Sequence, residues 1–561
     1  MREDNTLDIQ KLVQQAGFVS IQDYMKERVI PVLIVTVSCF FITLFLFKDA
    51  GLPILLLPFV ILIGGLAYPP LYLKSIVEKK KTNIHENIHL FITYIGAIAS
   101  LDISRVRVFT EASKKEEYGE ITETVKKILY LATDWELGFA KTLRKVASLE
   151  PSIMFSEFLD RLAAALDFGE PLDLFLMKEQ RAVMDEYEME YKKSLEWMNT
   201  LRDMYSSLLI AGAFIFVASI LLPFFLPYSV ETLIVLTALF LATANACVYV
   251  MVESFIPKAQ MCHKLKIKDK EHKEMMKHMR TMVLICPVIF LVMTLIGVFS
   301  YSVNLALAIT PLGYIGFLAS QKERAVSKRD NEFPGFIRSL GGSLSAKGGS
   351  MATTLEALRV HEFGVLNYNI EMLYRRLKLG TDKLVTWAYF SGESGSQLIY
   401  EFCNIFVDVT KLGGDPERAC EIISENFSRL LHLRKLRAQL SGSLKGMFYG
   451  AILALSLTVY AGLQSIKIIS GTISSMTNSV SDAPMAKEML GNIFLSPDAF
   501  NLPLITCLVF TILVLQAAFT SFLIKAIDGG EKYACLMDLV ILTWIIVAIE
   551  YLSTYVGSMI L

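Results

Sequence analysis

The sequence is poor in charge for its length. Asp, Glu, Lys and Arg make up 19% of the 561 residues, whereas 53% are hydrophobic, and the mean hydropathy is +0.48. Ordinary soluble domains carry about 25% charged residues, so the composition excludes an ordinary soluble protein of this size. It indicates a membrane protein.

The sequence also lacks any Gly-Lys dipeptide. The stretch GGSLSAKGGSMATTLEAL at 341–358 is rich in glycine, but a phosphate-binding loop requires G-x-x-x-x-G-K-[ST]. Here Ala346 precedes Lys347, so the lysine cannot reach a phosphate cradled by the glycine turn. We therefore predict no nucleotide site and no cofactor.

Histidine is scarce, and no residues show the spacing of a known metal site or of a catalytic group. One short segment gathers four metal-ligand types at spacings that match no zinc site: Cys262, His263, His272 and His278. His85 and His89 lie four residues apart but lack the glutamate of a zinc protease. We predict no catalytic residue, no metal and no nucleic-acid partner.

Long apolar runs, by contrast, are abundant. Nine runs are long enough to cross a bilayer: 29–47, 51–73, 206–227, 231–252, 281–299, 303–320, 446–466, 502–524 and 535–560. Inside lipid a helix satisfies every backbone donor and acceptor, so each run is predicted to be a helix. Residues 1–28 are polar and no small-residue cleavage site follows the first run, so we expect this run to stay in the protein.

The distribution of Lys and Arg predicts the orientation in the cell membrane. With the N-terminus in the cytoplasm, all but three of the 54 basic residues face the cytoplasm; the exceptions are Lys48, Lys467 and Lys487. Nine spans then place the C-terminus outside.

The spans divide the chain into alternating segments. We predict a cytoplasmic N-terminus (1–28), a transmembrane hairpin (29–73), a first cytoplasmic domain (74–205), two spans (206–255), a basic cytoplasmic loop (256–280), two spans (281–320), a second cytoplasmic domain (321–445) and three spans (446–561) with an outward loop (470–501). Apolar residues recur every three or four positions in both domains, which predicts helical bundles and an all-α polytopic protein.

The two cytoplasmic domains share a local pattern that suggests duplication. Glu157-Phe158 is followed by Gly169 and Pro171, and Glu401-Phe402 is followed by Gly414 and Pro416, with one residue of slip. The glycine predicts the end of a helix and the proline the start of the next. Charged helices at 178–203 and 417–443 then run into the membrane and are predicted to act as stalks.

The glycine stretch at 341–358 is predicted to be a helical hairpin. An apolar stripe leads to Gly348 and Gly349, and Thr353 with Glu356 forms a capping box for the next helix. Ser350 is the alternative cap if that helix begins earlier.

This turn, Lys347-Gly348-Gly349-Ser350 leading to Leu355-Glu356-Ala357-Leu358, resembles the opening of the type II secretion F domain. That domain occurs in the inner-membrane platform proteins of type II secretion systems, type IV pili and archaella (archaeal flagella). The nine runs and two domains resemble the archaellum platform family. The motif evidence lies in the second domain; the counterpart in the first, from Ile98 to Leu101, is degenerate.

The resemblance implies a platform and not an enzyme. Family members sit beneath a filament, above a hexameric cytoplasmic secretion-type ATPase, and act with archaellin or pilin-like subunits and other motor components; a homodimer is expected. The platform of an adhesive pilus or of a type II-like secretion system stays open as an alternative. A transporter fits less well, because the runs contain little charge.

Charge suggests where the ATPase docks. Residues 257–280 carry eight Lys or Arg against three Asp or Glu. The predicted docking residues are Lys264, Lys266, Lys268, Lys270, Arg375, Arg376 and Lys378. The alternative is that the loop lysines only set the topology and contact anionic headgroups in the lipid bilayer.

Glu550 is the one acid well inside an apolar run. An acid within the membrane is a candidate for a proton path, but a packed structural contact explains it as well, and we favour the structural contact.

Overall fold

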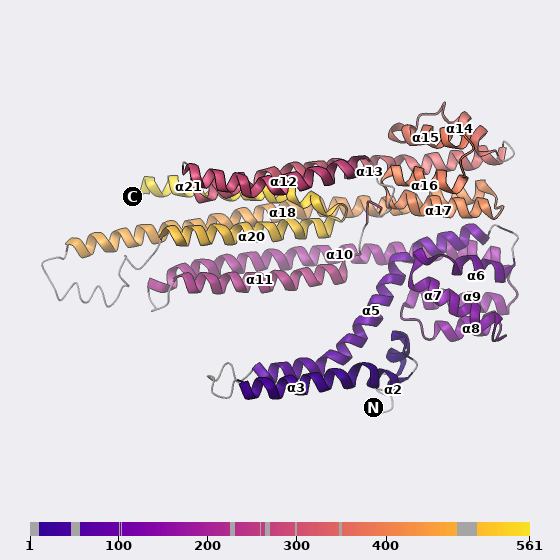
Figure 1. Cartoon of the computed structure of the whole chain (residues 1–561), viewed down its shortest axis with the longest axis horizontal. Helices are drawn as coiled ribbons and strands as arrows, with labels where there is room; N and C mark the ends of the chain where they lie inside the picture. Colours follow the sequence, from indigo (N-terminus) through magenta and orange to yellow (C-terminus); the bar gives the residue numbers. More distant parts are fainter. Residues whose placement is uncertain are drawn as a thin grey trace. The chain divides into compact units, whose positions relative to one another are not determined.

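The chain is built from helices. The computed structural model describes residues 10–18, 20–46, 57–99, 101, 104–224, 230–257, 260–263, 270–297, 300–346, 350–479 and 502–560. Within these ranges every regular element is a helix, and a single β-bridge joins Cys262 to Ser396 (Figure 1). The predicted all-α fold is confirmed.

The described residues fall into two compact units. One comprises residues 1–187 with 405–426, and the other residues 188–404 with 427–561. The first unit contains α2 (Ile21–Tyr24), η1 (Met25–Val29), α3 (Ile30–Leu46), α5 (Leu57–Ala99), α6 (Arg105–Ser113), η2 (Glu116–Tyr118), α7 (Glu120–Thr133), α8 (Phe139–Ala147), α9 (Ile153–Asp167) and the start of α10 (Leu172–Leu221).

The core of the first unit is aromatic. The Phe91 ring on α5 meets the Phe155 ring edge-on at 6.0 Å, and Phe155 stacks on Phe158 one turn later. Each of these side chains is at most 2% exposed. The three-residue and four-residue spacing seen in the sequence thus gives the face on which α9 packs.

The second unit contains the remaining helices and parts of three that both units share: most of α10, η3 (Leu222–Phe224), α11 (Val230–Phe255), α12 (Lys270–Ile296), α13 (Tyr301–Ala346), α14 (Met351–Leu358), η4 (Gly364–Leu366), α15 (Asn367–Lys378), α16 (Lys383–Ser394), the start of α17 (Gln397–Lys411), most of α18 (Pro416–Ser479), α20 (Leu502–Asp528), η6 (Lys532–Ala534) and α21 (Cys535–Ile560). Helix α13 packs against α12 and α21, and α20 packs against α11 and α21 (Figure 1). At Gly316 an added Cβ would lie 2.3 Å from the backbone nitrogen of Met537, so only glycine permits this approach of α13 to α21.

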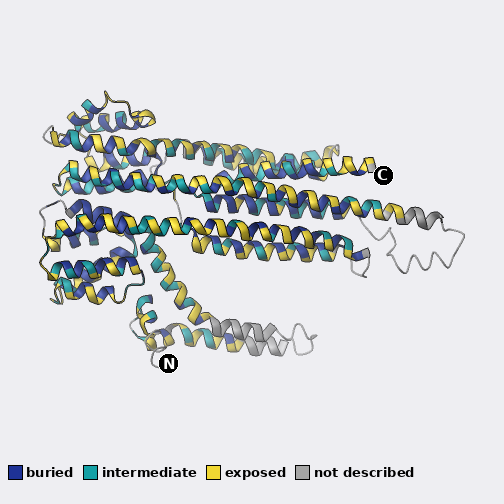
Figure 2. Ribbon diagram, turned by 180° about the vertical axis from the view of Figure 1, so that it is seen from behind, coloured by how far each residue is buried: buried dark blue, intermediate teal, exposed yellow. Residues whose placement is uncertain are grey.

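Seven helices of the described part are long and apolar enough to cross a membrane, by length and composition. They overlap the last seven predicted runs, and apolar side chains such as Leu284, Leu291 and Leu295 of α12 are exposed. Figure 2 shows exposed residues along the long helices. Water would not solvate such faces, whereas lipid does. The protein is therefore a multi-pass membrane protein. The predicted runs 29–47 and 51–73 lie partly outside the described residues, and the count of nine stays a prediction.

The order of elements repeats. Helices α5 to α10, with η2 in the third place, correspond one by one to α13 to α18, with η4 in the third place. Ser152 caps α9 by accepting from the Phe155 amide, and Ser396 caps α17 by accepting from the Ile399 amide. The duplication suggested by the sequence is supported by this shared order.

The structure aligns Gly169 of the first repeat with Gly413 of the second, one residue before the glycine matched from the sequence. Gly169 and Gly413 both have positive φ, 71° and 87°, and both close a helix with the same pair of amide bonds. Gly414, which we had matched with Gly169, is packed instead: an added Cβ would meet Val409 at 2.5 Å. The slip therefore lies between the glycine and Pro416, because Gly414 is an extra residue in the turn.

The second predicted domain, 321–445, contributes residues to both units. Residues 405–426, the end of α17 and the start of α18, pack within the first unit. Lys115 forms an ion pair with Asp408, and Asn426 donates to Thr93 on α5 at 2.8 Å. Sequence order could not reveal this exchange, because it depends on tertiary pairing of the repeats.

Candidate functional site

The predicted capping box at the start of α14 is absent. Helix α13 ends at Ala346 and α14 begins at Met351, so a helix ends and the next one begins on either side of the predicted turn; Gly348 and Gly349 lie outside the described residues. Ser350 is the N-cap, and Thr353 lies inside α14, where its hydroxyl donates to the Ser350 carbonyl at 3.0 Å. The prediction of Thr353 as cap was wrong, because a hydroxyl inside the first turn bonds back to the preceding carbonyl.

The candidate docking residues on the second domain lie at the end of α15. Arg376 forms a two-pronged ion pair with Glu393 of α16, one bond measuring 3.0 Å, and its guanidinium lies 4.9 Å from the centre of the Tyr389 ring. Lys378 lies over the Tyr374 ring at 5.5 Å. These contacts hold Arg376 against the domain, whereas Lys378 stays exposed.

Arg375 is more exposed than Arg376. Its side chain is 62% exposed, against 25% for Arg376, and it reaches Glu371 one turn earlier at 2.7 Å. This hydrogen bond from Arg375 is the largest of the contacts that hold the pKa of Glu371 below its usual range. An exposed pair of this kind is weak and opens readily, so Arg375 can bind a partner at little cost.

The basic loop starts next to this surface. The amide of Gln397 donates to the carbonyl of Met261 at 3.0 Å, and the His263 ring bonds the Gly392 carbonyl at 2.7 Å. Gly392 adjoins Glu393, the partner of Arg376. The fold therefore anchors the loop near α16 although more than 100 residues separate them. Lys264, Lys266 and Lys268 lie outside the described residues, and Lys270 begins α12.

Cys262 and His263 thus fasten the loop to the second domain. Among the described residues, no group of three or more His, Cys, Asp or Glu lies close enough to hold a metal ion.

A cluster of buried charges joins the stalk α18 to its neighbours, and the sequence analysis missed it. Arg434 reaches Asp330 of α13 at 3.0 Å, and that carboxylate is 1% exposed. Burial raises the pKa of Asp330 to about 6, although Arg434 opposes the rise. The only signal in the sequence was the three-residue spacing of Arg434 and Arg437 in a helix that carries many other charged residues. That spacing alone does not predict a buried charge cluster.

Arg437 is the second member of this junction. Its guanidinium is 2% exposed and donates to the backbone carbonyls of Ile527, Pro257 and Ala526, at 2.8, 2.6 and 3.4 Å. These carbonyls lie at the C-terminal end of α20 and just after that of α11, where helices carry unpaired acceptors and partial negative charge. One side chain therefore binds the stalk to the ends of two apolar helices.

Two more ion pairs lie at the same level of the unit. Lys322 reaches Glu531 at 3.0 Å and Lys525 reaches Glu323 at 2.7 Å, and both lysines are at most 8% exposed. Paired charges tie α13 to α20 and to the turn before α21. Together these residues form a junction that links α11, α13, α18 and α20. Its hydrogen bonds fix the geometry of the contacts as well as pairing their charges.

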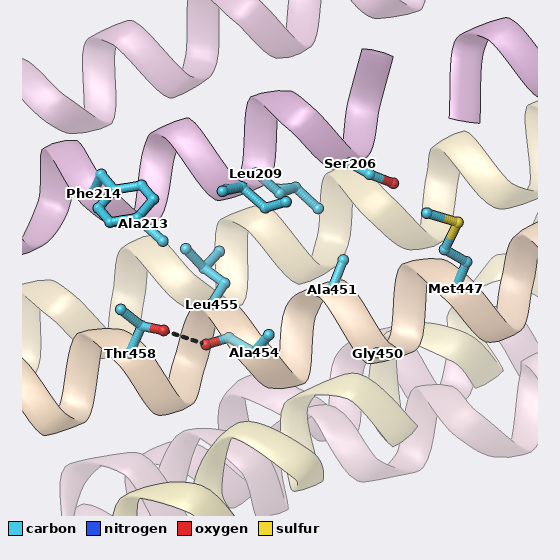
Figure 3. A pocket seen from close by; sticks show the side chains of 11 residues that line it. Ser206, Leu209, Ala213, Phe214, Met447, Gly450, Ala451, Ala454, Leu455 and Thr458 are labelled. Atoms are coloured by element: carbon cyan, nitrogen blue, oxygen red, sulfur yellow. Dashed lines mark hydrogen bonds between the residues drawn. The ribbon is translucent and has the colours of Figure 1, made fainter. Parts of the chain in front are cut away.

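A groove opens between α10 and α18 in their apolar parts. Its volume is about 410 Å³, and eleven residues line it (Figure 3): Ser206, Leu209, Ile210, Ala213, Phe214, Met447, Gly450, Ala451, Ala454, Leu455 and Thr458. The Thr458 hydroxyl already donates to the Ala454 carbonyl at 2.8 Å. A lining without charge suits hydrocarbon and gives an ionic substrate no partner.

Polar side chains also meet inside the apolar helices. The amides of Asn245 on α11 and Gln516 on α20 bond each other, at 2.8 and 3.3 Å, and Gln516 donates to the Tyr205 hydroxyl at 3.0 Å. Tyr205 in turn shares a hydrogen with Thr520 at 2.7 Å. The network holds α10, α11 and α20 together, because an unpaired amide in hydrocarbon is costly.

Glu550 lies on α21 beside two hydroxyls. The side chains of Ser302 on α13 and Tyr460 on α18 face its carboxyl group. We expect Glu550→Gln to leave the filament that the family resemblance implies unchanged in number by electron microscopy, because an amide has nearly the shape of the carboxyl group. Loss of filaments at normal protein level would show instead that the ionisable proton is needed.

Known proteins are similar to this chain over nearly its whole length. The family model described as type II secretion system protein F matches residues 91–220, which cover most of the first predicted domain and the start of the span after it, whereas our motif came from the second predicted domain. Flagella accessory protein J of Methanocaldococcus jannaschii is 33% identical over 553 residues, with 96% of both chains covered. The protein of the same name from Methanococcus voltae is 30% identical over 537 residues, with 93% and 94% covered. No solved structure matches the chain. On this likeness, this membrane protein belongs to the family of flagella accessory protein J, the platform proteins of archaella and related pili.

Proposed function

We propose that this protein couples a cytoplasmic secretion-type ATPase to the insertion of filament subunits during archaellum assembly, with the N-terminus in the cytoplasm and the C-terminus outside. It acts as a platform and catalyses no reaction itself. The archaellum is favoured over an adhesive pilus or a secretion system because both full-length relatives carry the flagellar name. In the archaellum the same coupling would also turn the filament.

The continuity of the long helices is the observation that carries this proposal. Helices α10 and α18 run for 50 and 64 residues from the cytoplasmic segments into the apolar parts without a break. A continuous helix transmits displacement along its axis, whereas a flexible loop absorbs it. Movement imposed on the cytoplasmic end would therefore reach the spans, and the buried charges around Arg434 and Arg437 would pass it to α11, α13 and α20.

Deletion of the gene tests the function directly. We expect cells without the protein to lack archaella in electron micrographs and to be non-motile, while the filament subunit accumulates in the membrane. Loss of adhesive filaments with archaella intact would favour the pilus alternative. Normal archaella and pili would contradict both.

Docking of the ATPase is proposed at the exposed end of α15 and the adjoining basic loop. Arg375→Glu should raise the dissociation constant for the purified ATPase about three- to tenfold, because it reverses an exposed charge that faces the partner. The binding is measured with the full chain in lipid nanodiscs. Arg376→Glu is a poor probe, since it would break the ion pair with Glu393 within the domain.

Lys126→Glu is the matched control. Lys126 lies on α7 of the other cytoplasmic segment, its side chain is 42% exposed, and it pairs with Glu123 on its own helix as Arg375 does with Glu371. Equal loss of binding in both variants would mean that net charge matters and not the α15 surface. Unchanged binding in Arg375→Glu would remove the α15 surface as a docking site.

A further inference from the structure

The groove between α10 and α18 lies between equivalent positions of the two repeats. Pro171 directly precedes α10 and Pro416 begins α18, so the two helices can be aligned from these prolines onward. Lining residues of α10 then coincide with lining residues of α18: Ser206 with Ala451, Leu209 with Ala454, Ile210 with Leu455 and Ala213 with Thr458. The two walls of the groove therefore come from the same part of each repeat (Figure 3).

Small side chains on α18 leave the groove open. Where α10 carries Leu209, α18 carries Ala454, and an added Cβ on Gly450 would meet nothing within 4 Å. The floor is buried, since Leu209 and Leu455 are 1% and 2% exposed, whereas Phe214 on the rim is 71% exposed. The result is a concave apolar site of about 410 Å³, within the ~300–1,000 Å³ range of small-molecule sites.

The length of the groove fits one leaflet of a bilayer. Its lining runs from Ser206 to Phe214 on α10 and from Met447 to Thr458 on α18. At ~1.5 Å per residue these segments cover about 12 Å and about 17 Å, roughly half of a ~30 Å hydrocarbon core. A membrane-spanning helix of a partner protein would need a groove along the whole core, whereas a lipid chain ends near the midplane. The length therefore favours a lipid over a partner helix.

The end of the groove at Ser206 adjoins the charged part of α10. Arg202 lies one turn before Ser206 on the same side of the helix, and its carbonyl accepts the Ser206 hydroxyl at 2.8 Å. The Arg202 side chain is 31% exposed, and its Nε donates to Asp203 at 2.9 Å. Asp203 is 65% exposed, so this pair is weak and can open for another anion. A guanidinium suits a phosphate group, which it can bind through two parallel hydrogen bonds.

We infer that the groove binds one phospholipid of the leaflet on the side of Arg202, with an acyl chain between α10 and α18 and the phosphate group at Arg202. The uncharged lining accepts hydrocarbon, and a chain inside the groove contacts wall atoms on several sides, which a lipid on a flat helix face does not. Because both walls belong to the stalk helices, the bound chain holds them at a fixed separation. This site goes beyond the proposed coupling function and does not depend on it.

Native mass spectrometry of the full chain in mild detergent tests the site. Phosphatidylglycerol and diacylglycerol with the same acyl chains are titrated separately, so that the phosphate-containing headgroup is the difference between them. We expect one phosphatidylglycerol per native chain, bound about tenfold more tightly than diacylglycerol, because only the first lipid offers Arg202 an anion.

Ala454→Leu fills the groove with the side chain that α10 carries at the equivalent position. It should weaken the binding of both lipids about tenfold or more, because the leucine occupies the space of the acyl chain. Ala211→Leu is the matched control: it makes the same change at an exposed position of α10 that does not line the groove, and it should bind both lipids as the native chain does. Thermal unfolding of each variant shows whether the fold is intact.

Arg202→Gln separates the headgroup from the chain. It should weaken phosphatidylglycerol to the affinity of diacylglycerol and leave diacylglycerol binding unchanged. Arg181→Gln is the matched control, since Arg181 lies earlier in α10 and its side chain is 68% exposed. It should leave the affinity for both lipids as it is in the native chain.

Three results would overturn the inference. They are a native chain that retains no more lipid than Ala454→Leu does, an Ala454→Leu chain that binds lipid as the native chain does, and equal affinities of the native chain for the two lipids. Displacement of the bound lipid by the purified filament subunit would assign the groove to that subunit instead. None of these results changes the outcome expected from deletion of the gene, which tests the proposed function separately.

Discussion

Arg437→Met is expected to abolish filament assembly and to destabilise the protein by about 3–5 kcal/mol, because three backbone carbonyls lose their donor at once. The methionine fills most of the space but donates nothing to Ile527, Pro257 or Ala526. Stalk α18 then loses its direct bonds to the ends of α11 and α20. Thermal unfolding of the full chain in nanodiscs gives the stability, and electron microscopy of cells gives the filaments.

Arg437→Lys separates charge from geometry. Lysine keeps the positive charge but cannot direct a planar fork at two helix ends, so we expect a smaller loss of stability and partial assembly. If the Arg437→Met variant unfolds at the same temperature as the native chain and cells that carry it make normal filaments, the junction does not connect the stalk to the spans. If Arg437→Lys behaves as the native chain does, charge alone is sufficient.

Arg434→Met is expected to cost about 3–5 kcal/mol above pH 7, because Asp330 is left buried and ionised without its cation. In the native chain the folded pKa of Asp330 is raised to about 6 from 3.8, so stability falls as the pH rises from about 4 to about 6. Without Arg434 the folded pKa rises further, and stability keeps falling above pH 6. The loss caused by the mutation is therefore small near pH 5 and large near pH 8.

Unfolding measured at both pH values tests this sign. The double variant Asp330→Asn with Arg434→Met should recover much of the stability at pH 8, since no buried charge is left over. A loss that is equal at the two pH values would show that Arg434 acts through packing or through its bond to the Gln260 carbonyl. Recovery of stability without recovery of filaments would assign the ion pair a role in transmission.

Local signals in the sequence were sufficient where one segment decides its own structure. The apolar runs predicted the long helices because hydrocarbon leaves the backbone no other partner. The helical hairpin around Gly348 was predicted from an apolar stripe that stops at glycine. The same kind of reasoning misplaced the cap at Thr353 and matched Gly169 with Gly414, because helix ends vary by one or two residues with the detail of the turn.

The candidate docking surface was predicted only in part. Arg375, Arg376 and Lys378 were chosen as charges far from the spans, and the structure places all three in the last turn of helix α15. It also distinguishes among them: Glu393 and Tyr389 hold Arg376, whereas Arg375 stays largely exposed. Sequence patterns cannot make that distinction, because Glu393 lies on another helix.

The sequence by itself determined the membrane class, the helical fold, the repeat and the family resemblance, since each follows from composition or from residues close together in the chain. Only the tertiary structure showed that residues 405–426 join the first unit and that Arg437 binds the ends of two helices. The physical reason is the same in each case. Burial and charge pairing depend on which distant segments meet, and two repeats of similar sequence can be packed differently by their neighbours.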